Sequence, residues 1–339
     1  MTNGMLAKRG LSAIVSRIGL LSLAEKYILS RKSVVLMYHR VLPSIAAGQI
    51  VVQPGMYVSN TTFENHIEYL NRCYKIVFID ELVDKILNNE YLGGYCALTF
   101  DDGWLDNYTN AFPILKKHHV PATIFLATGF IGAEKLFWPE EICFYLERFN
   151  LDSIASNIMP PATKNFMSTI VRYKHMRREQ YFENSIAILK KYSSRERTGI
   201  LEYFRNIIKI GSIPRQMINW DEARNMLSSG LVRFGAHSVN HEILDQVSPE
   251  IMKDEILTSR GDIEHHLGCC IKTFAYPNGN HNKNISCVLE ENGFYGAVTT
   301  QKGFLCSTTS PMKIPRVAVH EDVSTTISLL RARILSRFF

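Results

Sequence analysis

Short apolar runs alternate along this chain with segments in which apolar residues recur at helical spacing. The runs are bounded by polar or turn-forming residues, a pattern typical of buried strands. Strands that alternate with helices predict a parallel α/β fold, and their number suits an irregular (β/α) barrel of seven to eight strands. The runs lie at 34–37, 75–79, 97–100, 122–127, 232–234, 273–276, 296–299 and 316–319.

The pattern changes at about 130–217, where no comparable strand run occurs. Helical spacing is present at 140–149, 177–192 and 194–210, and Pro160-Pro161 predicts a break between helices. We therefore expect a helical insertion within a barrel domain that spans 33–339. Aromatic residues of such an insertion usually pack in its core, but Trp138 is a candidate platform on which a sugar could stack.

Both ends of the chain mix apolar residues with lysine and arginine. Residues 1–32 predict an amphipathic helical segment, and residues 329–339 predict a second basic helix. The favoured interpretation is packing against the barrel with a solvated basic face. Peripheral contact with the inner face of a membrane is the alternative.

Composition narrows the class of protein. The chain has 339 residues, is 46% apolar and 21% charged, and carries a net charge of +6, which describes a globular protein. No nucleic-acid-binding motif is present, so we expect no nucleic-acid partner. The 7 cysteines are an odd number without paired spacing and predict free thiols. With no clear signal peptide and no run of transmembrane length, we expect a cytoplasmic location.

The first candidate for chemistry is the acidic pair Asp101-Asp102, which follows the run at 97–100 and precedes Gly103. Neighbouring side chains on a strand point in opposite directions, but a turn at the glycine can re-aim the second acid. One carboxylate could then bind a metal while the other handles a proton. The alternative is an acidic pair that caps the helix expected at 105–115.

The second candidate is the pair His237 and His241, which follows the run at 232–234. The His-x-x-x-His spacing would place both rings on one face of a helical turn, and imidazole is a good zinc ligand. Ser238 stands where the metalloprotease helix motif has its glutamate, so this is a different kind of site. Together the two pairs predict a metal-dependent hydrolase site at the carboxyl ends of the strands.

At this point the chain resembles the polysaccharide deacetylases of the NodB-homology group, carbohydrate esterase family 4. The resemblance covers roughly residues 33–128 and 217–320. The segments that carry it are Val34 to Val41, Met56 to Ser59 with Phe63 and Leu70, Thr99 to Trp104, Trp220 to Glu222, His237 to His241, and Phe274 to Gly279.

The resemblance implies roles for individual residues. Asp101 would be the general base, and Asp102, His237 and His241 would bind one divalent metal ion, expected to be zinc. Such a site leaves a position for water, whose pKa the metal lowers. The resemblance also implies that the backbone N–H of Tyr276 stabilises the oxyanion.

Two departures from the family pattern suggest replacements. The third motif lacks the arginine that usually orients the base, and Arg316 is the candidate substitute. His320, in Val317-Ala318-Val319-His320, is the candidate general acid, with a surface histidine as the alternative. Residues expected to contact substrate are His39, Trp104, Pro277 and Trp138, although for His39 a satisfied core histidine is the favoured interpretation.

The expected activity is removal of an N-acetyl group from an N-acetylated sugar of a surface glycan or its precursor. The substrate could be polymeric, lipid-linked or nucleotide-linked. One alternative is hydrolysis of an O-acetyl or another acyl group on carbohydrate, because ester and amide hydrolysis use the same chemistry. Another is a carbohydrate-binding relative without turnover.

Overall fold

The computed structural model describes residues 27, 30–43, 52–53, 55–149, 159–208 and 215–335. The chain divides into two compact units. The first comprises residues 1–44, 57–132 and 217–339, and the second comprises 45–56 and 133–216. The larger part of the second unit, residues 133–216, falls in the region where the insertion was expected, at about 130–217.

The first unit is built on a curled, eight-stranded parallel sheet in the order β10-β1-β5-β6-β7-β8-β9, with β4 also paired to β5. Each strand coincides with one of the apolar runs, so the predicted strands are confirmed. Their bounds are β1 Val34–Tyr38, β4 Lys75–Val77, β5 Tyr95–Phe100, β6 Ala122–Leu126, β7 Val232–Ala236, β8 Thr273–Ala275, β9 Gly296–Val298 and β10 Val317–Ala318.

The two ends of the sheet are joined by the segment that leads into β10. The N–H of Ile314 donates to the carbonyl of Ala297 in β9, and the N–H of Thr299 donates to the carbonyl of Ile314, both at 2.9 Å. The same segment continues into β10, which pairs with β1. The sheet is therefore the predicted irregular barrel, in which parallel strands direct their carboxyl ends to one side.

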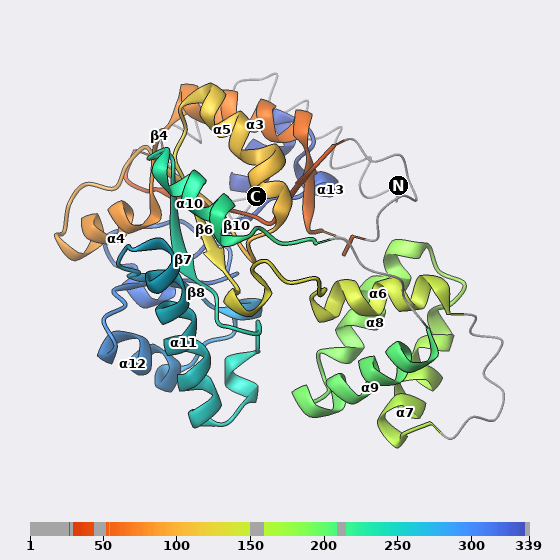
Figure 1. The fold of residues 1–339 in the computed structure, drawn as a ribbon. Helices are drawn as coiled ribbons and strands as arrows, with labels where there is room; N and C mark the ends of the chain where they lie inside the picture. The colour runs from red at the N-terminus through yellow and green to blue at the C-terminus, as the bar shows by residue number, and fades with distance from the viewer. Residues whose placement is uncertain are drawn as a thin grey trace. The chain divides into compact units, whose positions relative to one another are not determined.

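Helices pack against the outer face of this sheet, as Figure 1 shows for α3, α5, α11 and α12. The outward side chains of the strands, such as Leu98 and Phe100 of β5, share one apolar cluster with Phe63 of α3 and Ile256 of α11. The helices are α3 Asn60–Cys73, α5 Phe112–His118, α10 Trp220–Ser228, α11 Pro249–Leu267, α12 Lys283–Glu291, α13 Glu321–Ser324 and α14 Ile327–Leu335.

The opposite face of the strands packs against α4, which comprises Ile79–Leu87. Leu82 and Val83 of α4 share a second apolar cluster with Val35, Ala97 and Phe125 of the strands. A Cβ atom at Gly296 would lie 2.6 Å from a methyl group of Val83, so glycine permits this close approach. The helix that follows β4 thus fills the interior of the barrel toward the amino ends of the strands.

A short parallel pair, β2 Arg40–Leu42 and β3 Tyr57–Ser59, stands apart from the barrel sheet. The apolar pattern did not predict it, because each strand includes a polar residue, Arg40 or Ser59, and neither forms a continuous apolar run. β2 follows β1 after His39 alone. This pair therefore lies directly beyond the carboxyl end of β1.

The second unit is helical, with α6 Trp138–Arg148, α7 Pro161–Ile170, α8 Arg178–Leu189 and α9 Ser194–Ile207. Its own apolar cluster includes Tyr145, Phe166 and Phe204. The predicted break at Pro160-Pro161 falls between α6 and α7, because Pro160 lies outside the helix as its N-cap and Pro161 is the first residue of α7, where proline is well tolerated. Trp138 packs in this unit with the guanidinium of Arg197 4.9 Å from its ring centroid.

Most of the predicted helical segment at 1–32 lies outside the described residues. At the other end, α14 buries Leu330, Ile334 and Leu335 in the cluster that covers the barrel, as the packing interpretation expects. Within the described residues, no helix combines the length and apolarity needed to cross a membrane. All seven cysteines lie in the described residues and are free thiols, as predicted.

Candidate active site

The backbone turns sharply at the two adjacent acids that follow β5. Asp102 has a φ of 78° and Gly103 a φ of 87°, so the chain bends immediately after Asp101. A positive φ is unusual for aspartate and is maintained only when the surroundings hold it. The turn thus directs two buried carboxylates, only 2% and 4% exposed, to different partners, as the sequence predicted.

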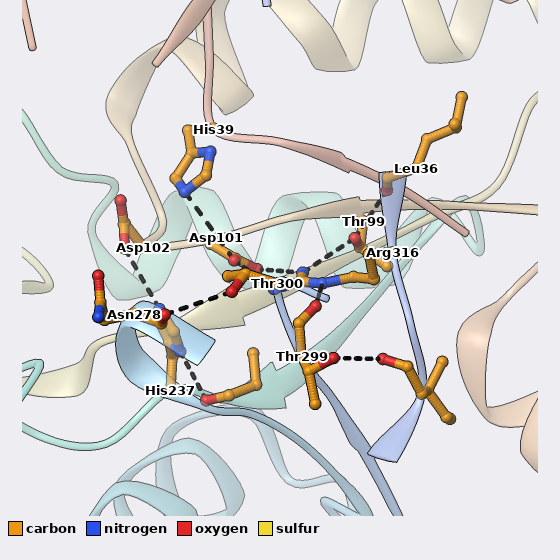
Figure 2. A network of polar contacts seen from close by, with 12 residues as sticks. Leu36, His39, Thr99, Asp101, Asp102, His237, Asn278, Thr299, Thr300 and Arg316 are labelled. Carbon is orange, nitrogen blue, oxygen red and sulfur yellow. Dashed lines mark hydrogen bonds and ion pairs between the residues drawn. The ribbon is translucent and has the colours of Figure 1, made fainter. Parts of the chain in front are cut away.

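Asp101 is held by Arg316, as Figure 2 shows. The two terminal nitrogens of Arg316 donate to the two carboxylate oxygens of Asp101, each at 2.7 Å. The guanidinium is itself fixed, because its Nε donates to the carbonyl of Thr299 at 2.9 Å and one terminal nitrogen donates to Thr99 Oγ1 at 3.1 Å. The predicted contact between Arg316 and the candidate base is therefore present, with the bidentate geometry that favours an ionised carboxylate.

This pairing decides the charge on Asp101. Burial disfavours the ionised carboxylate, but the charge and hydrogen bonds of Arg316 outweigh burial, so the pKa of Asp101 lies below its ordinary value. Arg316 is fully buried, which limits screening of the pair by solvent. Asp101 is thus ionised at neutral pH and able to accept a proton.

His39 also faces Asp101, with its Nε2 atom 3.9 Å from a carboxylate oxygen. It lies between β1 and β2, and its side chain is 17% exposed. Burial lowers the pKa of His39, and the nearby carboxylates of Asp102 and Asp101 only partly offset this effect. Of the two interpretations given for His39 from the sequence, the structure favours a residue of the site.

Asp102 faces the two histidines that follow β7. Its Oδ1 atom lies 3.4 Å from His237 Nε2 and 3.6 Å from His241 Nε2. The ligand atoms of the three residues all lie within 4.8 Å of one another. The prediction that the two pairs converge is correct.

The local conformation of the histidine segment differs from the expectation. The segment 237–241 is a loop instead of a helical turn, and both Ser238 and His241 have positive φ, 63° and 54°. The rings meet because the loop folds back, with their centroids 4.8 Å apart. The expected helical face was therefore wrong, although the two rings do come together.

The chemistry of this cluster fits a divalent metal ion. Asp102 Oδ1 is buried and has no hydrogen-bond partner among the described residues, yet it faces both Nε2 atoms. The Nδ1 atom of His237 bonds the carbonyl of Ala275 at 2.7 Å, which places its proton on Nδ1 and leaves the Nε2 lone pair available. Burial lowers the pKa of His241 to about 4, so this imidazole is neutral, the form that binds metals.

Glu255 of α11 holds the histidine loop. One of its carboxylate oxygens accepts the N–H groups of Val239 and Asn240, both at 2.8 Å, and the other accepts the side-chain amide of Asn240 at 2.8 Å. Glu255 is 5% exposed. No signal in the sequence identifies this residue, because it lies on a different element and becomes a partner of the loop only through packing.

The structure corrects the role expected for Trp104. Its side chain is 1% exposed, so it presents no ring face on which a sugar could stack. Its indole Nε1 instead donates to Asp102 Oδ2 at 2.9 Å. The residue next to the acidic motif supports a candidate metal ligand and does not form a surface for substrate.

The third motif is also more buried than expected. The N–H of Tyr276 donates to the carbonyl of Val298 at 3.1 Å, so it is engaged in the sheet. An N–H committed to this bond cannot also bind an oxyanion, and the expected role is not supported. The hydroxyl of Tyr276 donates to the carbonyl of Met312 at 3.0 Å, and Pro277 is buried.

His320 and Trp138 are not brought to Asp101 by any described contact. His320 is the N-cap of α13, its side chain is 20% exposed, and its Nδ1 lies 3.3 Å from the carboxylate of Asp322. Its role as general acid stays a prediction. Trp138 belongs to the second unit, and its predicted contact with substrate stays a prediction.

Comparison with known proteins gives the family. A family model described as polysaccharide deacetylase matches residues 89–297. The chain is 35% identical over 100 residues to YxkH of Bacillus subtilis, named as a polysaccharide deacetylase, a match that covers 29% of this chain and 33% of that protein. It is 24% identical over 216 residues to the poly-β-1,6-N-acetyl-D-glucosamine N-deacetylase of Staphylococcus aureus, covering 61% of this chain and 70% of that protein.

Solved structures agree on the fold. The deacetylase PplD of Streptococcus pyogenes superimposes with a TM-score of 0.57 and 19% identity, over 88% of this chain and 97% of that chain. IcaB of Ammonifex degensii gives a TM-score of 0.57 and 20% identity, over 89% and 97%. The chain belongs to the polysaccharide deacetylase family, a class of carbohydrate-active hydrolases, as its motifs indicated.

Proposed function

We propose that this protein is a metal-dependent N-deacetylase that acts on a polymer of N-acetylglucosamine. The observation that carries the proposal is the pairing of two adjacent carboxylates with different partners. Asp101 is held ionised by Arg316, while Asp102 faces His237 and His241. Hydrolysis of an unactivated amide needs both a base for water and an electrophilic group for the carbonyl, and this arrangement can hold both.

The choice of polymer is supported by the relatives. The Staphylococcus aureus protein is named for poly-β-1,6-N-acetyl-D-glucosamine, and its match covers 61% of this chain and 70% of that protein. We therefore name a β-1,6-linked N-acetylglucosamine polymer as the first substrate to test. Lipid-linked and nucleotide-linked N-acetylhexosamines are the next candidates.

Asp102, His237 and His241 would hold the metal, for which zinc is the first candidate because the donor set mixes carboxylate oxygen with imidazole nitrogen. When bound there, a divalent ion supplies Lewis acidity toward water and toward the acetyl carbonyl. The remaining steps fall to the residues of the chain.

Asp101 is placed to take the proton from the attacking water, because Arg316 keeps it ionised and fixed in orientation. The oxygen of that water bonds to the acetyl carbon, and the carbon–nitrogen bond then breaks. The departing nitrogen needs a proton to leave as an amine. Acetate and a free amino sugar are the products.

His39 is the histidine best placed to supply that proton. Its Nε2 atom is 3.9 Å from a carboxylate oxygen of Asp101, so a proton taken by the base would reach the imidazole through one bridging water. His320, the candidate from the sequence, has Asp322 as its described partner. His39→Gln should therefore reduce turnover more than His320→Gln, and the opposite order would return the role to His320.

The test is acetate release from poly-β-1,6-N-acetylglucosamine by the purified protein. We expect release by the native protein, loss after treatment with a chelator, and recovery with zinc. His237→Ala should lose both metal and turnover. Full activity in metal-free protein would contradict the proposed metal dependence.

The same assay separates the alternatives. Acetate released only from O-acetylated sugars would identify an esterase. Glycan binding without release of acetate from any substrate would identify a binding relative, a possibility that the complete set of four site residues argues against. The cytoplasmic location is part of the proposal and is tested by cell fractionation with an antibody against the protein.

A further inference from the structure

A column of buried side chains extends from Asp102 away from the two histidines. The first member is Trp104, whose indole N–H donates to Asp102 Oδ2 at 2.9 Å. The guanidinium carbon of Arg40 lies 4.2 Å from the centroid of the Trp104 ring, on its face. Arg40 Nε in turn donates to Asp106 Oδ2 at 2.9 Å. Arg40 comes from β2, and Trp104 and Asp106 come from the segment that follows β5.

The column is closed at its far end. The other carboxylate oxygen of Asp106 accepts the backbone N–H of Val41 at 2.8 Å. Arg40, Trp104 and Asp106 are 4%, 1% and 5% exposed. A buried ion pair costs free energy to desolvate, so one that packs on the ring beside a candidate metal ligand invites a functional explanation.

The geometry at Asp102 suggests that explanation. A carboxylate has two equivalent oxygens, and rotation about the Cβ–Cγ bond exchanges them. Here the indole N–H occupies Oδ2, while Oδ1 faces His237 and His241 and has no hydrogen-bond partner among the described residues. The indole therefore keeps Oδ2 of Asp102 engaged and leaves Oδ1 as the single oxygen that faces the two histidines.

We propose that Trp104, held by the Arg40–Asp106 pair, is a positioning residue that presents a single oxygen of Asp102 to the metal. The inference rests on the proposed metal site and adds Arg40 and Asp106, which lie outside the acidic and histidine motifs. Arg40 fixes the plane of the indole by packing on its face, a contact that is stronger when the cation is desolvated. Asp106 fixes Arg40.

The test is binding of cobalt(II) to metal-free protein, followed by visible absorption. Trp104→Phe keeps an aromatic ring and removes the N–H. We expect it to weaken cobalt binding about 10- to 100-fold, the range seen when a group that orients a metal ligand is lost. We also expect a weaker visible band, because a carboxylate free to rotate can bind through both oxygens and raise the coordination number.

A matched control separates this role from packing. Trp220 is partly buried on α10 and stacks on His266, with the ring centroids 4.3 Å apart. Trp220→Phe removes an indole N–H elsewhere in the same unit and should leave cobalt affinity and the spectrum unchanged. Equal loss of affinity in both variants would mean that the effect of Trp104→Phe is general destabilisation and would overturn the proposal.

A second variant keeps the proposal testable if Trp104→Phe does not fold. Arg40→Lys retains the positive charge beside Asp106 but loses the planar group over the indole, and should weaken cobalt binding several-fold. Unchanged affinity and spectrum in the folded variants would overturn the positioning role. If native protein binds no cobalt, or Asp102→Ala binds it as well as native protein, the proposed metal site itself fails.

Discussion

Two arginine–aspartate pairs stand toward opposite ends of the barrel. Arg316 is fully buried near the carboxyl ends of the strands and grips Asp101 with two hydrogen bonds of 2.7 Å. Arg233, the second residue of β7, donates to Asp80 of α4 at 2.7 Å, but its side chain is 44% exposed. The residue types and the distance are the same, so burial and geometry decide what each pair does.

The surroundings of the pairs differ in the same way. Toward the amino ends, α4 packs its apolar side chains into the sheet, and the Arg233–Asp80 pair lies at the edge of that packing. Among the described residues, six other than glycine have positive φ. Asn89 and His119 precede β5 and β6, whereas Asp102, Ser238, His241 and Asn278 follow strands at their carboxyl ends. The amino end of the barrel thus contributes mainly apolar packing, whereas the carboxyl end concentrates unusual backbone conformations at the candidate site.

Replacing each arginine by methionine gives the sharpest contrast. Arg316→Met should lower turnover on the order of a hundredfold or more, because it removes the group that orients Asp101 and keeps it ionised. Arg233→Met should leave turnover unchanged and alter the free energy of unfolding by about 1 kcal/mol or less, as for other exposed pairs. Steady-state kinetics and urea unfolding of both variants measure the difference.

The pH profile adds a direction to this prediction. Arg316 holds the pKa of Asp101 below its ordinary value, and the base works only when deprotonated. Turnover therefore falls as the pH drops through that pKa, and loss of Arg316 should move this acidic limb to higher pH. A variant that keeps the native profile would leave Asp101 without an identified partner.

A smaller loss of turnover is expected when Glu255 is replaced, because Glu255 contacts the histidine loop and not the reacting groups. Glu255→Gln removes the charge that accepts two backbone N–H groups of the histidine loop. We expect roughly tenfold weaker metal binding, and the same loss of turnover when metal is limiting. Asp254→Asn, at the exposed neighbour on α11, is the control. Equal metal affinity in both variants would show that the histidine loop keeps its conformation without the charge of Glu255.

No loss of turnover is expected when Leu82 is replaced, because Leu82 belongs to the apolar packing of α4 and not to the candidate site. Leu82 is fully buried in the cluster around α4. Leu82→Ala should lower the free energy of unfolding by roughly 2–5 kcal/mol while the folded protein keeps its native kcat. A fall in kcat at a temperature where the variant is fully folded would show that the two ends of the barrel are coupled.

The barrel strands could be predicted because each is a short buried run with clear boundaries. The two-stranded pair Arg40–Leu42 and Tyr57–Ser59 was missed, since each strand includes a polar residue and neither forms a continuous apolar run. The break at Pro160-Pro161 was predicted, but the helix α7 that begins at Pro161 was not. Local signals thus sufficed for strands that lie within a continuous apolar run.

The site residues also divide into those that the sequence predicted and those that it did not. The acidic and histidine pairs were visible because each follows a strand, and Arg316 was expected to replace an arginine absent from the third motif. Glu255 and the column behind Trp104 were not visible, because their contacts join elements distant in sequence. The burial of Trp104 was also missed, since an aromatic residue beside a motif suits either a sugar platform or the core.

The central claim is that the turn at Asp102 gives two adjacent acids separate tasks. The most direct test is zinc content and acetate release measured on Asp101→Asn and Asp102→Asn side by side. The account predicts that Asp101→Asn binds about one zinc per chain without turnover, because an amide keeps the shape and cannot accept the proton, while Asp102→Asn loses zinc. Zinc lost from Asp101→Asn and retained by Asp102→Asn would reverse the assignment and contradict the account.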